Sequence, residues 1–373
     1  MMMKKRVMTR KKMIAAMIMF SFWGIILVSA LGGPVAAATD FERIEITNSV
    51  GTKVTFDEPA QKAASLGISF TTTLLELGCR DCIIMIDSYS APENSGIDGL
   101  ESIPNYSIYN NGQQIAQILA DGEGGFDKNR DVIFVYGYLY HENDIKSLEQ
   151  LGLKVVTFYP ETYEAGMEMV ADIGAIMGQN EKAAEITDSM QSAADYYSEM
   201  LATTRISPDS KTKAIYASYS GTNIRVGNLN SYSVILMKMA GGANPADDPN
   251  KTGGSLVAYE VDNTIFMQLD YDVIFLDPYY AKTPSEFRAE NHISSDVKIY
   301  KLDVLMNQYG PTSRDGIEFM AKAMYPDIFG SLEEEQNESS RNNYWIYIAI
   351  TIVIAIIVAA AYLIFKQKNS AAL

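Results

Sequence analysis

Apolar runs, most of them without the polar–apolar alternation of a half-exposed strand, recur along the middle of the chain with helical patterns between them. These runs are KAASLGI, CIIMIDSY, DVIFVYGYLY, KVVTFY, KAIYASYS, DVIFLDPYY and KIYKLD. Continuous apolar runs predict strands covered on both faces, and strands separated by helices predict parallel α/β sheets. The runs form two groups, one before and one after residues 163–204, so we expect two Rossmann-like α/β lobes.

The segment between the two groups is predicted to be helical, because residues 163–204 contain no strand pattern and no proline. The pattern breaks at Gly178, after which Asn180 is placed to cap a new helix. Apolar residues then recur at helical spacing along one face, at Ala183, Ile186, Met190, Ala193, Ala194, Tyr197, Met200 and Leu201. A helix of about 24 residues would extend roughly 36 Å. That length favours a spine joining two lobes over a crossover helix inside one large sheet.

The N-terminal end has the pattern of an export signal. Lysine and arginine residues precede an apolar run from Met13 to Leu31, and the small residues 36–38 follow it. This pattern predicts a cleaved signal peptide over residues 1–38. The apolar run is long for a signal peptide, which leaves an uncleaved N-terminal anchor as the alternative.

The C-terminal end has the pattern of a membrane span. Residues 345–365 form an uninterrupted apolar run, and about 21 residues of helix cross a hydrocarbon core of roughly 30 Å. Aromatic residues lie at its start, and Lys366 and Lys368 follow its end, as expected for a cytoplasmic side. We therefore expect a single-pass anchor that holds the preceding part of the chain on the extracellular face of the membrane.

Together these patterns divide the 373 residues into segments. The expected segments are 1–38 (signal peptide), 39–165 (N-terminal lobe), 166–204 (connecting helices with the spine), 205–330 (C-terminal lobe), 331–343 (polar linker), 344–365 (transmembrane helix) and 366–373 (cytoplasmic tail). The formal net charge is −16, which argues against a nucleic-acid partner because such a partner needs a face rich in lysine and arginine.

A ligand site is expected beyond the carboxyl ends of the strands, where open α/β sheets bind their ligands. The residues there are unusually rich in tyrosine and hydroxyl groups, and tyrosine suits a concave site for a bulky ligand with few charges. The candidate ligand-binding residues are Ser69, Phe70, Thr71, Tyr89, Tyr136, Tyr138, Tyr159, Tyr219, Asn223, Arg225, Tyr232, Tyr279, Tyr280, Tyr309 and Arg314. The alternative is that these tyrosines are ordinary strand-end packing residues.

Two kinds of anion contact are possible within this set. The segment from Ser69 to Thr71 begins a predicted helix, where hydroxyls and free N–H groups favour an anionic or polar group. Arg225 and Arg314 could each hold a carboxylate through two parallel hydrogen bonds, or could form ordinary surface ion pairs.

Catalytic and metal-binding motifs are missing from the sequence. It contains no GxSxG, GxxxxGK[ST] or HExxH motif, so hydrolase and NTPase functions lose their best support, and no metal site is expected. The two histidines, His141 and His292, fall in different lobes, and a calcium loop starting at Asp248 would place Tyr259 where a glutamate is needed. The CRDC motif follows a helix, which fits a small local disulfide better than redox catalysis.

Several weak motifs, in order, carry a resemblance to a known family. They are FERIEITNSVGTKVTFDEPAQKAASL, LLELGCRDCIIMIDSYS, DVIFVYG and LEQLGLKVVTFYPETYEAGMEMVADIGAIMGQNEKAAEI in the first half, then SYSVILMKMAGGANPA, YEVDNTIFMQLDYDVIFL and YGPTSRDGIEFMAKAMYPDIF. From about Phe41 to Phe329 the chain resembles the substrate-binding proteins of ABC importers for iron-siderophore, haem and cobalamin-type ligands. With its C-terminal anchor it resembles the membrane-tethered archaeal members.

The resemblance implies a receptor without catalytic activity that binds a metal chelate, a ferric siderophore or a corrinoid, between two lobes. Its implied partners are an ABC permease and its ATPase. Such proteins commonly carry one glutamate per lobe that docks on the permease, but the matching positions here look like Ala116 and Thr264. Glu260 or Asp262 could serve nearby.

Two other functions stay open on the sequence. One is a surface sensory or interaction protein that keeps the two-lobe fold without transport, which the missing glutamates would explain. The other is an extracellular metalloenzyme that uses His141, Asp87 and Glu161.

Overall fold

A computed structural model describes residues 41–48, 51–137, 142–204, 210–220, 223–251 and 257–332. The predicted signal peptide, transmembrane helix and cytoplasmic tail, nearly all of the linker, and the candidate residues Tyr138 and His141 lie outside these ranges. Among the described residues, no helix is both long enough and apolar enough to cross a membrane.

The N-terminal lobe is built on a five-stranded sheet in the order β5-β4-β3-β6-β7, and all of its neighbouring strands are parallel. Its strands are β3 (Ala63–Leu66), β4 (Ile83–Asp87), β5 (Asn105–Tyr106), β6 (Val132–Tyr136) and β7 (Lys154–Phe158). Its helices are α2 (Ile68–Glu76), α3 (Pro92–Ser95), α4 (Ile108–Ala120) and α5 (Glu142–Gln150). Strand β3 is buried along its whole length, as its continuous apolar run predicts.

An antiparallel hairpin precedes this lobe. It consists of β1 (Ile44–Thr47) and β2 (Lys53–Phe56), which pair only with each other, and β2 contacts the edge strand β7. The apolar runs did not indicate these two short strands.

The C-terminal lobe has a second five-stranded sheet, in the order β10-β9-β8-β11-β12. Its strands are β8 (Ala214–Ser220), β9 (Asn223–Gly227), β10 (Ala258–Val261), β11 (Val273–Leu276) and β12 (Lys298–Lys301). Its helices are α8 (Tyr232–Met239), α9 (Asn263–Gln268), α10 (Pro284–Glu290), α11 (Ser313–Met324) and α12 (Pro326–Phe329). Because β9 runs antiparallel to both of its neighbours, the expectation of a parallel sheet is wrong for this strand.

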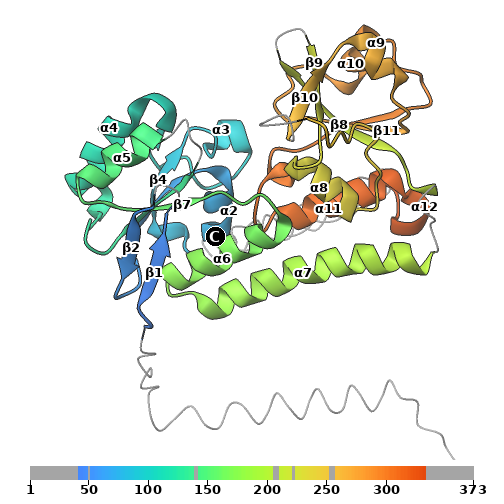
Figure 1. Cartoon of the computed structure of the whole chain (residues 1–373). Helices are drawn as coiled ribbons and strands as arrows, with labels where there is room; N and C mark the ends of the chain where they lie inside the picture. The colour runs from blue at the N-terminus through green and yellow to red at the C-terminus, as the bar shows by residue number, and fades with distance from the viewer. Residues whose placement is uncertain are drawn as a thin grey trace, which may run out of the picture. The chain divides into compact units, whose positions relative to one another are not determined.

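Each sheet has a hydrophobic core of its own. One buried cluster joins side chains of β3, β4, β6 and β7 to α4 and α5, and a second joins β8, β9 and β11 to α9 and α10. The two cores share no residue, so the predicted division into two α/β lobes is confirmed (Figure 1).

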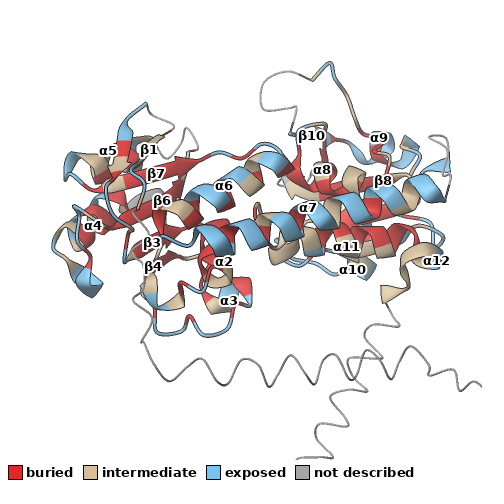
Figure 2. Ribbon diagram, turned by 90° about the horizontal axis from the view of Figure 1, so that it is seen from below, coloured by how far each residue is buried: buried red, intermediate tan, exposed pale blue. Residues whose placement is uncertain are grey.

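Two helices follow the N-terminal lobe, α6 (Tyr163–Ile176) and the 24-residue α7 (Asn180–Thr203). Helix α7 contacts α6 at one end and α11 and α8 of the C-terminal lobe further along (Figures 1 and 2). The predicted spine is therefore confirmed. The predicted Asn180 cap is wrong, because Gln179 occupies the N-cap position and no side chain caps the helix.

The buried face of the spine matches much of the predicted stripe. Ala183, Ile186, Met190 and Tyr197 are buried, whereas Ala193, Ala194, Met200 and Leu201 are half-buried. Helix α6 approaches α7 closely at Gly174, and the Tyr163 hydroxyl donates a 2.9 Å hydrogen bond to the Met190 carbonyl. The spine is thus fixed to the N-terminal lobe by close packing as well as by the chain connection.

A buried carboxylate organises the start of β6. The Asp131 side chain is fully buried and accepts hydrogen bonds from the backbone N–H groups of Gln61, Lys62 and Asp127 at 2.8–3.0 Å, and from the Arg130 guanidinium at 2.9 Å. Burial alone would raise the pKa of this carboxyl, but the hydrogen bonds from Arg130 and from the backbone outweigh it and lower the pKa.

Replacing Asp131 by asparagine should lower the free energy of unfolding by about 2 kcal/mol at pH 7, because it removes a buried charge with four donors. Since the folded pKa is depressed, this stabilisation is present above the unfolded pKa of about 3.9 and is lost as the pH falls through the folded value. Denaturant unfolding at pH 7 and pH 3 measures the difference between the chains. An equal loss in the exposed control Asp98→Asn, or a loss that persists unchanged at pH 3, would contradict this account.

Candidate functional site

A cavity of about 720 Å³ lies between the two lobes. Its N-terminal wall comes from the carboxyl ends of β3, β4 and β6, and its C-terminal wall comes from β8, β9, α8, β10 and the segment before α11. The lining residues are Leu66, Ile68, Asp87, Tyr89, Tyr136, Tyr216, Ser218, Arg225, Ser231, Tyr232, Ser233, Val257, Ala258, Asp277, Tyr279, Asn307, Gln308 and Tyr309. Six of the candidate residues are therefore on one surface: Tyr89, Tyr136, Arg225, Tyr232, Tyr279 and Tyr309.

The N-terminal wall is built around Tyr136, the last residue of β6. Its hydroxyl donates to Ser69 Oγ at 2.7 Å, and its ring lies 4.6 Å from the ring of Phe70. A Cβ at Gly67 would come within 2.6 Å of the Tyr136 ring, so only glycine fits beneath that ring. The contacts with Gly67, Ser69 and Phe70 thus orient the Tyr136 side chain toward the cavity.

The hydroxyl residues at the start of α2 face the inside of the lobe. Ser69, Phe70 and Thr71 are fully buried, and the Thr71 hydroxyl bonds to Ser65 Oγ at 2.8 Å and Ser90 Oγ at 3.0 Å. None of the three lines the cavity. They support its wall, and the expectation that their side chains offer open anion-binding groups does not fit these contacts.

The C-terminal wall consists of aromatic and polar side chains that contact one another. The rings of Tyr232 and Tyr309 lie 4.2 Å apart, and Tyr309 reaches across the lobes to Tyr136, with ring centroids 6.4 Å apart. Tyr216 donates to the carboxylate of Asp277 and accepts a 3.2 Å hydrogen bond from Asn307. Burial, with the adjacent Asp277 carboxylate, raises the pKa of Tyr216 well above its usual value, so this phenol stays protonated.

Two similar turns face each other across the cavity. Asp87 ends β4 and Asp277 follows β11, and each carboxylate accepts from the backbone N–H of the tyrosine two residues later, at 3.3 Å for Tyr89 and 2.8 Å for Tyr279. The two tyrosines are 45% and 52% exposed, and their rings meet edge to face at 6.0 Å. Each lobe therefore contributes one aspartate and one exposed tyrosine to the wall of the inter-lobe cavity.

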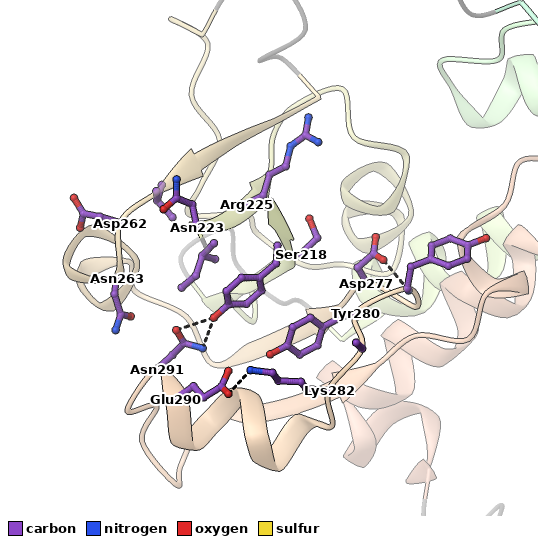
Figure 3. A pocket seen from close by; sticks show the side chains of 15 residues that line it. Ser218, Asn223, Arg225, Asp262, Asn263, Asp277, Tyr280, Lys282, Glu290 and Asn291 are labelled. Carbon is purple, nitrogen blue, oxygen red and sulfur yellow. Dashed lines mark hydrogen bonds and ion pairs between the residues drawn. The ribbon is translucent and has the colours of Figure 1, made fainter. Parts of the chain in front are cut away.

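A second cavity, of about 870 Å³, lies within the C-terminal lobe (Figure 3). Tyr219 and Tyr280 stack on its wall at 5.2 Å, and the Tyr219 hydroxyl bonds to Asn291. Lys282 forms an ion pair with Glu290 beside them. Burial raises the pKa of Tyr280 to about 12. The candidate residues Tyr219, Asn223 and Tyr280 line this cavity.

The two cavities adjoin each other, because Ser218, Arg225, Asp277 and Tyr279 line both. Arg225 is exposed on β9 and forms no ion pair with any described residue. The exposed Arg225 therefore lies at the boundary between the two cavities.

Other candidate residues lie elsewhere. Tyr159 is 52% exposed and lines neither cavity. Arg314 on α11 pairs with Glu76 of α2 at 2.6 Å and donates to Ser189 Oγ of α7 at 3.3 Å. Arg314 therefore joins helices of both lobes to the spine, and this contact differs from the predicted ligand contact.

The expected docking carboxylates have local partners. Glu260 accepts a 2.8 Å hydrogen bond from the Asn223 amide, and Asp262 caps α9 by accepting from the Ile265 N–H at 2.8 Å. Of the positions that match the family glutamates, Ala116 is buried and Thr264 is exposed.

The described part of the chain brings no metal-binding cluster together. Asp87 lines the inter-lobe cavity, Glu161 is exposed and lines neither cavity, and His141 lies outside the described residues. The CRDC cysteines are free, and burial together with the neighbouring Cys82 raises the pKa of Cys79 to about 12. A thiol with that pKa is a poor nucleophile at neutral pH.

Several lining residues were not predicted from the sequence. Tyr216 and Ser218 lie inside a strand rather than after one, and Val257 and Ala258 lie at the start of β10. The expectation that ligand-binding residues follow the carboxyl ends of strands does not include such positions. The alternation of Tyr216 and Ser218 in KAIYASYS, which places them on one face of the strand, is the signal that could have found them.

No protein-family model matches the sequence, and no curated protein matches it. Solved structures do match the fold. A periplasmic molybdate-binding protein of Haemophilus influenzae, MolA, has a TM-score of 0.62 and 15% identity over 77% of this chain and 92% of its own. The fold is that of periplasmic solute-binding proteins.

Two further solved structures share this fold. A protein of an ABC-type Fe³⁺-hydroxamate transport system from Saccharomonospora viridis has a TM-score of 0.55 and 18% identity, over 76% of this chain and 98% of its own. The periplasmic haem-binding protein HutB of Vibrio cholerae has a TM-score of 0.58 and 13% identity, over 71% of this chain and 99% of its own. At these identities the comparisons establish the fold.

Proposed function

We propose that this chain is the solute-binding component of an ABC importer and captures a metal chelate between its lobes. The observation that carries the proposal is the cavity of about 720 Å³ walled by the strand ends of both lobes, which are joined by the spine α7. Its volume falls in the range of about 300–1,000 Å³ that suits compact ligands. Its wall of tyrosines suits a bulky, partly apolar ligand, such as a ferric siderophore or a corrinoid.

The proposed site has no catalytic role. Its residues hold the ligand by ring contacts and hydrogen bonds, with Arg225 available for an anionic group of the ligand. The chelated metal belongs to the ligand, so the protein needs no intrinsic cofactor. Proteins of this fold include ones named for Fe³⁺-hydroxamate transport and for haem binding, which supports the proposed class of ligand.

The proposed location is the extracellular face of the membrane, after export by residues 1–38 and with residues 344–365 as the anchor. A tether keeps the receptor near its permease and raises its effective concentration there. Glu260 and Asp262 are the proposed docking residues.

Binding can be measured directly by calorimetric titration of the full chain, purified in mild detergent, with ferric trihydroxamates, ferric catecholates, haem and cobalamin. We expect at least one of these chelates to bind at one site per chain with a Kd of about 1 μM or lower. A chain that binds none of them below about 100 μM would contradict the proposal.

A sensory or interaction protein without transport remains the second candidate. The observation that favours it is Ala116, a buried alanine where the family resemblance leads us to expect a docking glutamate. The two candidates share ligand binding and differ in docking. Stimulation of ATP hydrolysis in a reconstituted importer by the liganded chain would exclude the second candidate.

A further inference from the structure

The charges that line the inter-lobe cavity are unevenly distributed. Among the described residues of its wall, the charged side chains are Asp87, Asp277 and Arg225. Each lobe contributes one carboxylate at the end of a strand, and the arginine comes from β9 of the C-terminal lobe alone. The wall therefore carries a surplus of one negative charge when both aspartates are ionised.

Neither aspartate is neutralised by the part of the chain that the structure describes. Asp87 is only 6% exposed, and its described partners are the Ser90 N–H and hydroxyl and the Tyr89 N–H. Asp277 accepts from the Tyr216 hydroxyl and the Tyr279 N–H. All of these donors are neutral, and neither carboxylate forms an ion pair with a described residue.

A carboxylate in a water-poor site is costly unless a cation or several donors satisfy it. An ionised carboxylate has about four lone-pair sites, and the described donors to Asp277 occupy two of them. The remaining lone-pair sites of Asp277 are available to a ligand in the cavity that this residue lines. Asp87 is the more deeply buried of the two, and burial raises the pKa of its carboxyl, which fits a group that lacks a cationic partner before the ligand binds.

The exposed arginine does not remove this surplus. Arg225 lies on β9 and lines both cavities, and it forms an ion pair with neither aspartate. A ligand that fills the cavity would therefore meet the aspartates at the strand ends and the arginine on the β9 side. Closure over the ligand would exclude water and strengthen the interaction with each charge.

We propose that the ligand carries a positively charged ammonium group, which Asp277 and Asp87 hold at the strand ends of the inter-lobe cavity. This inference rests on the proposed function and narrows it to chelates that carry an ammonium group, such as a ferric trihydroxamate with a free amine. It disfavours ferric tris-catecholates, because these carry three negative charges into a wall that is already negative.

The test compares two ligands that differ only in this charge. Ferrioxamine B is a ferric trihydroxamate with a terminal ammonium, and its N-acetyl derivative has the same iron centre without the charge. By calorimetric titration of the full chain, ferrioxamine B should bind about tenfold tighter or more. Asp277→Asn and Asp87→Asn should each reduce this ratio toward one, because asparagine keeps an acceptor oxygen for the turn and removes the charge.

The exposed Asp98→Asn serves as the control and should leave the ratio unchanged. Equal affinities for the two ferrioxamines, or tighter binding of ferric enterobactin than of either, would overturn the inference. Binding of haem or cobalamin with no binding of either ferrioxamine would overturn it while the proposed function stands. If the chain binds none of these chelates, the result contradicts both the inference and the proposed function.

Discussion

Replacing Gly174 by leucine should lower the free energy of unfolding by about 3 kcal/mol, because the position has no room for a side chain. A Cβ there would lie 2.3 Å from the Cβ of Ala183 on the spine and 3.3 Å from the Gln179 carbonyl oxygen. Ala183 lies in the first turn of α7 and Gln179 is the N-cap residue of that helix, so relief requires the two helices to separate. Chemical denaturation followed by circular dichroism measures the loss.

The matched control for this prediction is Ala171→Leu, which adds a leucine to an exposed position of the same helix. That change should alter the free energy of unfolding by no more than about 0.5 kcal/mol. Equal effects of the two substitutions would show that the close approach of α6 to α7 does not contribute to stability as described.

Replacing Ser218 by tryptophan should weaken ligand binding at least about a hundredfold while leaving the protein folded. Ser218 is half-buried on β8 and lines both cavities, so an indole at this position would take up space that either cavity offers a ligand. A ligand that fills either cavity would then lose contacts on the side of Tyr216 and Arg225. The affinity for the tightest-binding chelate, measured by calorimetric titration, checks this expectation.

Ser192→Trp on the exposed face of α7 is the control for the added indole, because it lies away from both cavities. It should bind the chelate as the unchanged chain does. If Ser218→Trp retains full affinity and both variants unfold at the same denaturant concentration, the ligand does not occupy this hollow.

Much of the fold could be predicted because two signals were strong. The continuous apolar runs mark β3 and β11, which are buried throughout, and β6, which is buried up to its last residue, and the long helical pattern after Gly178 marks the spine. Strand β9 was missed because NIRVG alternates over only five residues and carries an exposed arginine. Its antiparallel direction depends on pairing with β8, which no local pattern reports.

The candidate site was predicted in part, and the errors have a common physical cause. Tyr89 and Tyr279 were located by the rule that ligands meet the ends of strands, and they do face one hollow. The same rule selected Ser69 and Thr71, whose hydroxyls face inward to Tyr136 and Ser65. Position along the chain identifies the edge of a sheet, but the direction of each side chain depends on its packing partners.

Arg314 shows the same difficulty for a charged residue. Arg314 was a candidate because cationic residues are scarce near it in the sequence, yet Glu76, far away in the chain, lies 2.6 Å from it. Pairing over such a distance in sequence arises from the packing of α11 against the other lobe and the spine. Arg225 lies opposite Ser218 on β8 and Glu260 on β10, and it forms no ion pair with a described residue.

The measurement that tests the central claim most directly is anomalous diffraction at the iron absorption edge from crystals of the full chain with its tightest-binding ferric chelate. The account predicts one iron peak per chain in the hollow between the lobes, within reach of Tyr136, Arg225 and Tyr279. An iron peak elsewhere on the protein, with this hollow unchanged, would contradict it.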